Sequence, residues 1–265
     1  MTSFAIVIPA RFASSRYPGK PLVALRGASG VARSLIERSW RAAMAVPGAA
    51  GVWVATDDAR IADAVRGFGG QVVMTSSACR NGTERCAQGL AHLPKVDVVV
   101  NLQGDAPLTP AHLIPDLVEA LAMAPEAAMA TAALRTSAST YAHLARDVAE
   151  GRVGGTTVVT AGDGRALYFS KRLMPYIPLD HPAPHELVKL HLGLYAYRPE
   201  ALAWYAAQAP SPLEELEGLE QLRFLEGAAP VRVVVHDPLG WDCIELNNPQ
   251  DVPVIEAILA QRGID

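Results

Sequence analysis

The sequence has few cysteines, and their placement excludes two classes of small stabilised protein. The three cysteines are Cys79, Cys86 and Cys243. No two of them have the spacing of zinc ligands. An odd, sparse set of thiols is typical of reduced structural cysteines in a reducing compartment, so we expect neither a disulfide framework nor a zinc module.

Long apolar runs are also lacking. The first apolar stretch, Phe4–Ile8, is too short for the core of a signal peptide and leads directly into Pro9 and Arg11. No segment reaches the ~20 apolar residues that span a bilayer. We therefore expect a soluble cytoplasmic protein with no membrane partner.

There is little excess charge of either sign. The 265 residues carry a formal net charge of −4 at pH 7, and the pI is about 6.0. Such a balance gives no overall attraction to nucleic acid. We therefore expect no nucleic-acid partner, and any phosphate binding requires a local cluster of cations.

Short apolar runs do alternate with longer stretches of helical spacing in the first half of the chain. The runs that predict strands are Phe4–Ile8, Val52–Ala55, Gln71–Met74, Val96–Val100 and Met129–Ala133. Continuous apolar strands between amphipathic helices indicate an α/β fold with a mostly parallel, Rossmann-like sheet sandwiched by helices. Ligands of such sheets bind beyond the carboxyl ends of the strands.

The pattern is less regular after about residue 150. We expect strands at Gly151–Thr160, Ala166–Ser170, Leu190–Tyr197 and Val231–Val235, a charged helix from Pro212 to Glu226, and a last helix from Pro249 to about Arg262. No low-complexity linker or repeat divides the chain. We interpret residues 1–265 as a single domain whose second half forms a smaller lobe.

A basic loop follows the first predicted strand. It carries Arg11, Arg16 and Lys20 together with Ser14 and Ser15. Arg grips phosphate oxygens bidentately, Lys provides a point charge, and exposed backbone amides fill further positions, so the loop suits a triphosphate. A solvated surface loop remains the alternative. The loop has neither a Walker A sequence nor Gly-x-Gly-x-x-Gly, which argues against a dinucleotide-dependent reductase.

The basic loop is the first of several segments that occur in the same order in one known family. The others are Asn81–Arg85, Val100–Asp105, Ala166–Ser170, His191–Tyr195 and Glu220–Arg223. Together they resemble the 3-deoxy-manno-octulosonate (Kdo) cytidylyltransferases, also called CMP-Kdo synthetases. The resemblance covers nearly the whole chain.

This resemblance implies an activity and a division of labour. The reaction is transfer of a cytidylyl group from CTP to the acidic 3-deoxy sugar Kdo, with Mg²⁺ as cofactor and pyrophosphate as the second product. The activated sugar serves lipopolysaccharide synthesis. The resemblance also implies a homodimer, in which residues 1–135 mainly bind CTP and residues 150–240 mainly bind the sugar and form the dimer.

The same resemblance implies a role for each matching residue. The catalytic residues are Arg11, Arg16, Lys20 and Asp105, where positive charge and a metal oppose the negative charge that grows in the transition state. The nucleotide-binding residues are Ala10, Arg11, Ser14, Arg16, Lys20, Arg80, Asn81, Gly82, Thr83 and Gln103. The sugar-binding residues are Lys171, His191 and Gln221, and the metal ligands are Asp105 and Asn247.

Several of these residues also have a plain structural interpretation. Thr83 and Glu84 suit the first turn of a helix as capping residues. Asp105 suits the turn before Pro107, and a single histidine in a strand, such as His191, is more often structural. The charged run from Glu214 to Glu220 is interpreted as mostly a solvated helix face.

Four positions depart from the family pattern. Ala106 replaces a Glu, Asn247 replaces an Asp, Lys171 replaces an Arg, and Thr157 replaces a Lys. Asn offers Mg²⁺ an uncharged carbonyl, for which Asp242 or Glu245 could compensate. Lys lacks the bidentate grip of Arg on a carboxylate. The alternatives are therefore another 3-deoxy-2-ulosonic acid as substrate, or a non-catalytic homologue that binds nucleotide.

Overall fold

The structure is a computed structural model that describes residues 2–14, 17–178 and 180–265. Arg16, one of the predicted phosphate ligands, lies outside the described residues. The contacts within the chain divide the protein into two compact units. The first contains Met1–Pro115, Tyr197–Ala206 and Cys243–Asp265, and the second contains Asp116–Ala196 and Ala207–Asp242.

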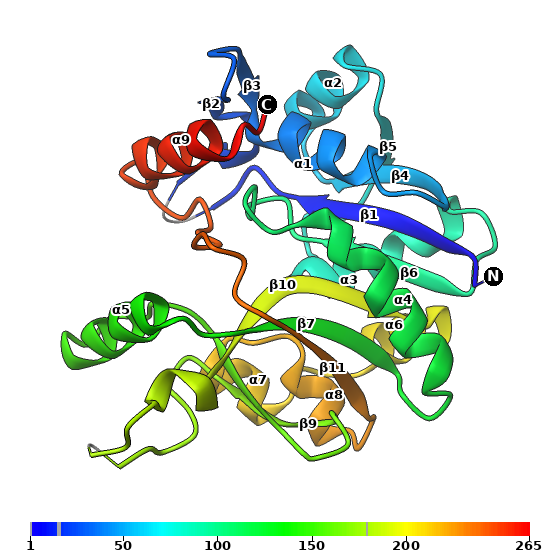
Figure 1. Cartoon of the computed structure of the whole chain (residues 1–265). Helices are drawn as coiled ribbons and strands as arrows, with labels where there is room; N and C mark the ends of the chain where they lie inside the picture. The colour runs from blue at the N-terminus through cyan, green and yellow to red at the C-terminus, as the bar shows by residue number, and fades with distance from the viewer. Residues whose placement is uncertain (1, 15–16, 179) are drawn as a thin grey trace. The chain divides into compact units, whose positions relative to one another are not determined.

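The first unit is built on parallel strands in the order β5–β4–β1–β6 (Figure 1). Their bounds are Phe4–Ala10 for β1, Ala49–Thr56 for β4, Gln71–Met74 for β5 and Val98–Leu102 for β6. Every residue of β6 is buried, and so is nearly all of β1. Burial on both faces is the reason these strands are continuous apolar runs in the sequence.

Helices connect and cover these strands. They are α1 (Leu35–Met44), α2 (Ala59–Gly67), α3 (Gly82–Gly89), α6 (Pro199–Ala207) and α9 (Asp251–Arg262), with short 3₁₀ turns η1 (Lys20–Leu22), η2 (Leu90–His92) and η3 (Ala111–Leu113). Side chains cap the first three, since Ser34, Asp58 and Asn81 accept hydrogen bonds from backbone amides of the first turn. No helix of the described residues is long and apolar enough to cross a bilayer.

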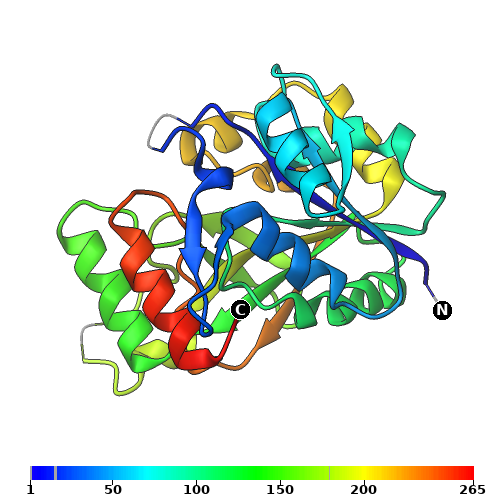
Figure 2. The same cartoon turned by 90° about the horizontal axis from the view of Figure 1, so that it is seen from above.

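The C-terminal helix is tied to a small hairpin of the same unit. The hairpin consists of β2 (Ala24–Arg26) and β3 (Ala32–Ser34), paired antiparallel. The amide of Arg26 donates to Glu256 Oε1 of α9 at 2.7 Å. Figure 2 shows the red helix beside the blue strand, so the last residues of the chain pack near its beginning.

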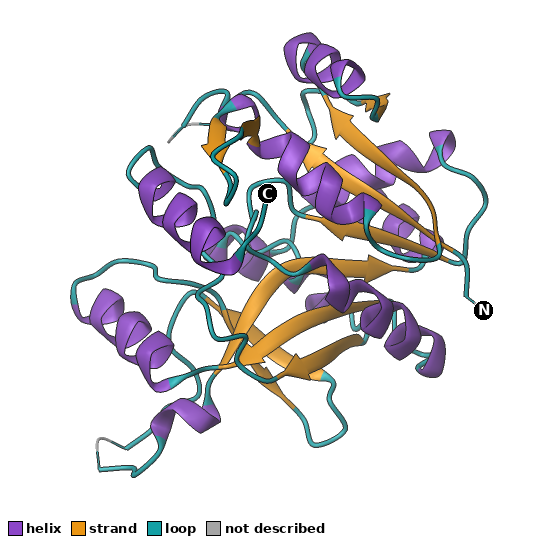
Figure 3. Cartoon of the chain, turned by 45° about the horizontal axis from the view of Figure 1, so that its top comes forward, coloured by secondary structure: helices purple, strands orange, loops and turns teal. Residues whose placement is uncertain are grey.

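The second unit has a mixed sheet. Its strands are β7 (Met129–Arg135), β8 (Thr157–Thr160), β9 (Ala166–Ser170), β10 (Lys189–Tyr197) and β11 (Val231–His236). β7 pairs parallel with β11, and β8 pairs antiparallel with both β9 and β10. The remaining elements, drawn in purple in Figure 3, are α4 (Ile114–Met123), which begins in the first unit, α5 (Ala138–Ala149), η4 (Pro184–Leu187), α7 (Pro212–Glu217) and α8 (Leu222–Glu226).

The predicted α/β class with a mostly parallel sheet is confirmed, but three element bounds are corrected. The strand expected from Gly151 contains only Thr157–Thr160, because Gly151 has a left-handed φ of 72° and Gly154 packs against Asp147 instead of pairing. The helix expected over 212–226 is broken at Gly218, whose φ of 62° ends α7. The last helix begins at Asp251, two residues after Pro249.

Candidate active site

The loop after β1 is folded around the ring of Phe12. Gly19 has a φ of 70°, and its amide donates to the Phe12 carbonyl at 2.9 Å. A Cβ on Gly19 would lie 3.0 Å from the Phe12 ring, so both the turn and the close approach require glycine. The guanidinium of Arg60 lies over the same ring, 3.3 Å from its centre. Contacts of Gly19 and Arg60 with Phe12 therefore hold the described part of this loop in a defined conformation. Arg11 is exposed in it.

Within this loop, Lys20 points to the turn that contains Gly104 and Asp105, called here the metal loop for the role predicted for Asp105. Its Nζ donates to Asp105 Oδ2 at 2.5 Å and to the carbonyl of Leu246 at 3.2 Å. The Lys20 side chain is only 13% exposed and that of Asp105 28%. The structure thus brings a predicted phosphate ligand and a predicted metal ligand into direct contact, although they are 85 residues apart in the sequence.

Gly104 explains how Asp105 reaches this position. A Cβ on Gly104 would lie 2.9 Å from the carbonyl oxygen of Pro9 and 3.2 Å from the side chain of Ile8. The first contact is with rigid backbone, so only glycine allows the metal loop to lie against the end of β1. Ser39 of α1 supports the turn by donating to the Gly104 carbonyl at 3.3 Å.

Gly82 brings the start of α3, where the predicted nucleotide-binding residues Asn81–Thr83 lie, to the same place. A Cβ there would lie 3.1 Å from Gln103 Nε2 and 3.2 Å from both Asn101 Nδ2 and the Pro9 ring. The start of α3, the end of β1 and the end of β6 therefore meet around one glycine. Since this is the carboxyl edge of a parallel sheet, it is the place where α/β proteins of this type bind their ligands.

The side chains at the start of α3 are engaged in holding the helix. Asn81 is the N-cap: its Oδ1 accepts from the Glu84 amide at 2.9 Å, and its Nδ2 donates to the Tyr205 hydroxyl at 2.8 Å. Thr83 is fully buried and shares a 2.8 Å hydrogen bond with the Tyr197 hydroxyl. The N-cap of α3 is therefore Asn81; of the two residues expected to cap it, Thr83 bonds Tyr197 instead, and Glu84 accepts from a backbone amide at this end. A role in nucleotide binding stays a prediction for these residues.

Glu84 completes the cap from the other side and leaves Arg80 at the surface. Glu84 Oε2 accepts from the Arg80 amide at 2.8 Å, and its Oε1 lies 3.3 Å from Arg80 Nε. The Arg80 side chain is 56% exposed. An exposed cation beside a helix N-terminus suits an anionic ligand, which agrees with the predicted contact of Arg80 with the nucleotide.

Asn101 is a candidate that the sequence reasoning missed. It is fully buried in β6, and neither its Oδ1 nor its Nδ2 has a hydrogen-bond partner among the described residues. A buried polar atom without a partner costs about 1–3 kcal/mol, which makes Asn101 a candidate for ligand contact. Its Nδ2 faces Gly82 beside Gln103. The sequence does contain one signal for this residue: Asn101 is the single polar side chain in the apolar run 98–102.

The predicted metal residues, Asp105 and Asn247, lie on two segments that are joined by a backbone hydrogen bond. The amide of Leu246 donates to the Asp105 carbonyl at 2.8 Å, which ties the residue before Asn247 to the metal loop. In the described part of the chain, no three His, Cys, Asp or Glu side chains are grouped to hold a metal ion. One carboxylate and one amide oxygen suit Mg²⁺ only when phosphate oxygens and water complete its shell.

The two carboxylates named as possible substitutes for the missing charge of Asn247 differ in their hydrogen bonds. Glu245 Oε2 accepts from Asn247 Nδ2 at 3.4 Å. Asp242 belongs to the second unit, where its Oδ1 accepts from the Thr140 hydroxyl at 3.0 Å. Asp251 caps the turn by accepting from the amides of Asn247 and Asn248 at 2.8 and 2.6 Å. Glu245 is therefore the better placed of the two to assist Asn247.

In the second unit, His191 is buried and neutral. Burial lowers its pKa from 6.5 to about 3. Its Nε2 lies 2.9 Å from the Thr131 hydroxyl, which itself donates to the Leu194 carbonyl at 2.8 Å. With the Thr131 hydrogen directed to Leu194, Nε2 would donate to the hydroxyl and Nδ1 would be the acceptor nitrogen. The structural interpretation of His191 thus holds for Nε2, and its contact with a sugar stays a prediction.

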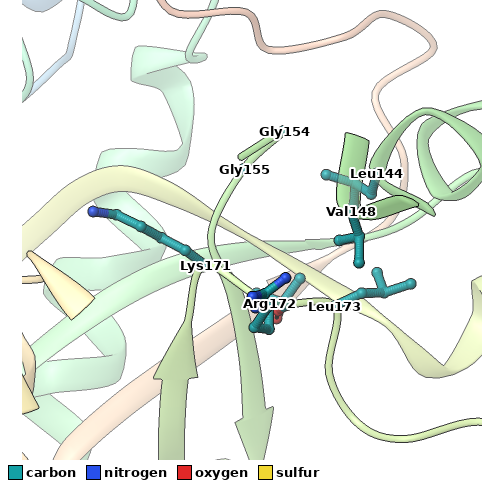
Figure 4. A pocket seen from close by; sticks show the side chains of 8 residues that line it. Leu144, Val148, Gly154, Gly155, Lys171, Arg172 and Leu173 are labelled. Atoms are coloured by element: carbon teal, nitrogen blue, oxygen red, sulfur yellow. Dashed lines mark hydrogen bonds between the residues drawn. The ribbon is translucent and has the colours of Figure 1, made fainter. Parts of the chain in front are cut away.

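The other two sugar candidates differ in burial. Gln221 is 1% exposed, and its Nε2 has no hydrogen-bond partner among the residues that the structure describes. Lys171 is half-buried, and its Nζ lies 2.8 Å from the position of a Cβ on Gly218. In Figure 4 the Lys171 side chain extends away from Leu144, Val148 and Leu173, which line the other side of a small pocket.

Glu217 holds the turn that carries Lys171. Its carboxylate accepts from the Ser170 hydroxyl at 2.8 Å and from the Lys171 amide at 3.0 Å. It also accepts from the Tyr168 hydroxyl at 3.5 Å, and desolvation together with this carboxylate raises the pKa of Tyr168. No local pattern separates Glu217 from its acidic neighbours, because its contacts depend on the break of the helix at Gly218.

The interpretation of the Glu214–Glu220 run as a solvated face is wrong for Glu214. Its side chain is 9% exposed and forms a two-point ion pair with Arg223, at 2.6 and 2.7 Å. A buried acid needs such a partner, and the interrupted helix folds back far enough to provide one. Glu215, in contrast, is exposed.

Thr157 has a defined role at the position where the family has a Lys. It is 1% exposed, its hydroxyl donates to the Arg172 carbonyl at 2.6 Å, and it accepts from the Met174 amide at 3.3 Å. These bonds fix the segment just after Lys171. Thr157 and Lys171, two of the positions that depart from the family pattern, are therefore close in the structure: Thr157 pairs with Ser170, the residue before Lys171.

The chain is similar in sequence to known proteins over most of its length. The sequence profile of the family described as Cytidylyltransferase matches residues 5–230. The chain belongs to this family. It is 44% identical over 263 residues to the 3-deoxy-manno-octulosonate cytidylyltransferase of Maricaulis maris, covering 98% of both chains. The corresponding mitochondrial protein of Arabidopsis thaliana is 38% identical over 263 residues, which cover 97% of this chain and 83% of the relative.

A solved structure supports the same assignment. It is that of CMP:2-keto-3-deoxy-manno-octonic acid synthetase complexed with CTP, with a TM-score of 0.83 and 32% identity, covering 98% of this chain and all of the other. The predicted resemblance and fold are thereby confirmed, and the chain is an enzyme of the cytidylyltransferase family. The individual roles predicted for its residues stay predictions.

Proposed function

We propose that this cytidylyltransferase moves the cytidylyl group of CTP onto Kdo, giving CMP-Kdo for lipopolysaccharide synthesis and pyrophosphate. One observation carries the proposal: Lys20, Asp105, Gly82 and Gln103 gather at the carboxyl ends of β1 and β6. The relatives named as Kdo cytidylyltransferases, which match nearly the full chain, point to the identity of nucleotide and sugar.

The chemistry asks mainly for positioning and charge. The anomeric hydroxyl oxygen of the sugar attacks the α-phosphorus of CTP and forms a new P–O bond. The bond to the β-phosphate oxygen breaks, pyrophosphate leaves with both electrons of that bond, and the hydroxyl proton passes to solvent. Exposed Arg11 and largely buried Lys20 oppose the charge that grows on the phosphates, and Arg16 is expected to contribute from the same loop.

Recognition of cytosine and ribose is assigned to the start of α3 and the end of β6. Gly82 allows the backbone to approach the base, and the Gln103 amide beside it offers a donor and an acceptor. Arg80 is exposed on the same segment, and Ala10 and Ser14 belong to the loop after β1. Asn81 and Thr83 keep this surface in place through Tyr205 and Tyr197.

Mg²⁺ is the proposed cofactor, held by Asp105 with the Asn247 carbonyl and by the phosphates of CTP. When bound, it supplies positive charge at the α-phosphate and lowers the pKa of the attacking hydroxyl. Asn247 adds no negative charge, so we expect weaker Mg²⁺ binding than two carboxylates would give.

The acidic sugar is assigned to the second unit. The Lys171 ammonium is the proposed partner of the sugar carboxylate, while neutral His191 accepts a hydroxyl at Nδ1 and Gln221 donates through Nε2. We also propose that the enzyme works as a homodimer, by resemblance to the family. Light scattering of the purified protein tests that point, and a mass of 28.1 kDa would contradict it.

The deciding experiment follows pyrophosphate release by the purified protein with Mg²⁺, CTP and Kdo. Release that requires CTP and Kdo together is the expected result. Because Lys171 and Thr157 depart from the family, parallel wells contain other 3-deoxy-2-ulosonic acids and other nucleoside triphosphates. Release with another acid alone would keep the reaction and replace the substrate, and CTP binding without release in any well would indicate a non-catalytic homologue.

A further inference from the structure

Lys20 and Asp105 form a contact that a divalent cation cannot share. The ammonium lies 2.5 Å from Asp105 Oδ2, and the Lys20 side chain is 13% exposed. Mg²⁺ bonds carboxylate oxygens at about 2.0–2.1 Å and keeps a full octahedral shell of waters and ligands. The volume that this shell needs around Oδ2 is occupied by Nζ.

Binding at the other carboxylate oxygen does not remove the conflict. A dication there would lie within a few ångströms of the Lys20 ammonium, and like charges at that distance repel strongly in a partly buried site. The donors available to offset the repulsion are few, because the neighbouring Asn247 is neutral and no acidic cluster lies in the described part of the unit. The charge of Asp105 is therefore already balanced by Lys20.

Leu246 links this pair to the loop that contains Asn247. The Leu246 carbonyl accepts from Lys20 Nζ at 3.2 Å, and the Leu246 amide donates to the Asp105 carbonyl at 2.8 Å. Withdrawal of Lys20 would thus free both a carboxylate oxygen and the backbone next to Asn247. A single movement of the Lys20 side chain would therefore expose both the Asp105 carboxylate and the Leu246 carbonyl to a cation.

We propose that Lys20 competes with the divalent cation for Asp105, so that the cation binds only together with the triphosphate. Phosphate oxygens attract the Lys20 ammonium away from Asp105, and they also complete the coordination shell that the protein alone lacks. The proposal rests on the proposed function in assigning Asp105 to the cation. It goes further in giving Lys20 control over when the site opens.

The test uses Mn²⁺ as the probe and measures its binding to the full-length protein without nucleotide, from the electron paramagnetic resonance signal of free Mn²⁺. Lys20→Met removes the ammonium and keeps a side chain of similar length, and Lys20→Gln is a second, polar replacement. We expect wild type to bind Mn²⁺ weakly and both variants to bind it about tenfold more tightly, because the repulsion and the steric block are gone. Lys95→Met, at an exposed site, is the matched control and should leave the affinity unchanged.

A second change locates the effect. Adding Asp105→Asn to Lys20→Met should abolish the gain in Mn²⁺ affinity. Circular dichroism melting shows whether each variant is folded. Unchanged or weaker Mn²⁺ binding in both folded Lys20 variants would overturn the proposal, as would a gain that persists without the Asp105 carboxylate. No nucleotide or sugar is present, so the result does not depend on whether the enzyme transfers cytidylyl groups to Kdo.

Discussion

In the first unit two charged candidates, Lys20 and Asp105, are paired with one another, whereas in the second unit the most buried candidates are neutral. Lys20 and Asp105 touch at 2.5 Å and remain partly exposed. His191 and Gln221 are 8% and 1% exposed, and His191 stays neutral because burial lowers its pKa. The contrast suits the two proposed ligands, because a triphosphate demands opposing charge and a sugar mostly offers hydroxyls.

The contrast also predicts which property a substitution should change, turnover in the first unit or stability in the second. Removing a charge from the first site acts on a transition state in which phosphate charge is moving, so turnover should respond more than stability. Removing a buried neutral group from the second site changes packing and hydrogen bonds of the folded state, so stability should respond strongly. Each of the following predictions tests one side of this difference.

The largest effect is expected for Asp105→Asn. The change keeps the size of the side chain but removes the charge that holds Lys20 and is proposed to hold the cation. Turnover should fall by about 10²–10³-fold, as for the loss of a preorganised electrostatic contact. Initial rates of pyrophosphate release measure this. Asp63→Asn, with a side chain 74% exposed on α2, is the control and should retain the wild-type rate.

The charge-based view of the first site would fail if Asp105→Asn lowered the free energy of unfolding as much as the activation free energy. Asp105 would then be a structural capping residue before Pro107. Urea unfolding of the same preparations separates the two outcomes, because it reports stability without substrates.

A pH-dependent loss of stability is expected from His191. Its folded pKa of about 3 lies below the unfolded value of 6.5, so protons bind the unfolded state more tightly. Its contribution is complete above pH 6.5 and decreases as the pH falls toward 3. The slope is about 1.4 kcal/mol per pH unit, so about 2 kcal/mol should be lost at pH 5.

Urea unfolding at pH 7.5 and 5.0 measures the effect in wild type and in His191→Gln. The Gln variant should lose less stability between the two pH values, because it has no proton to gain. His92→Gln, at an exposed position of η2, should behave as wild type. Equal slopes in wild type and His191→Gln would show that His191 is protonated in the folded state and would remove the contrast between the units.

A smaller effect is expected from two glycines at opposite ends of α3. At Gly82 an added Cβ would meet Gln103, Asn101 and Pro9 at 3.1–3.2 Å, whereas at Gly89 it would meet nothing within 4 Å. Gly89→Ala should raise the free energy of unfolding by about 0.4–1 kcal/mol through the unfolded state. Gly82→Ala should lower it by about 1 kcal/mol and raise the KM for CTP. If the two variants had the same KM, Gly82 would be a packing residue only.

The first unit was largely predictable from the sequence because its signals are local. Buried parallel strands produce continuous apolar runs, and β1, β4, β5 and β6 fall within a few residues of the predicted positions. The basic loop and the Gly104–Asp105 turn are also contiguous in the chain. What could not be predicted is the pairing of Thr83 with Tyr197, because the two residues are separated by 114 positions.

The second unit was less predictable because single glycines decide its elements. Gly218 interrupts a segment whose composition favours one helix, and Glu214 then turns to Arg223. Neither the left-handed turn nor the buried ion pair follows from helix propensity, which is a weak guide when tertiary contacts compete. The orphan amide of Gln221 likewise depends on burial that no local pattern reveals.

The smallest effect is expected for Lys171→Arg, which restores the family residue in the second unit. If Lys171 faces the sugar carboxylate, a guanidinium should grip it at two points and lower the KM for the acidic sugar a few-fold, about 0.5–1 kcal/mol, without changing kcat. Arg172→Lys is the matched control, since the adjacent side chain is exposed and Thr157 binds only its carbonyl. A lower KM for Kdo in Lys171→Arg alone would show that the second unit, too, uses one charge for its ligand. Identical KM values in both variants would leave His191 and Gln221 as the sugar-binding groups and would make the contrast between the two units complete.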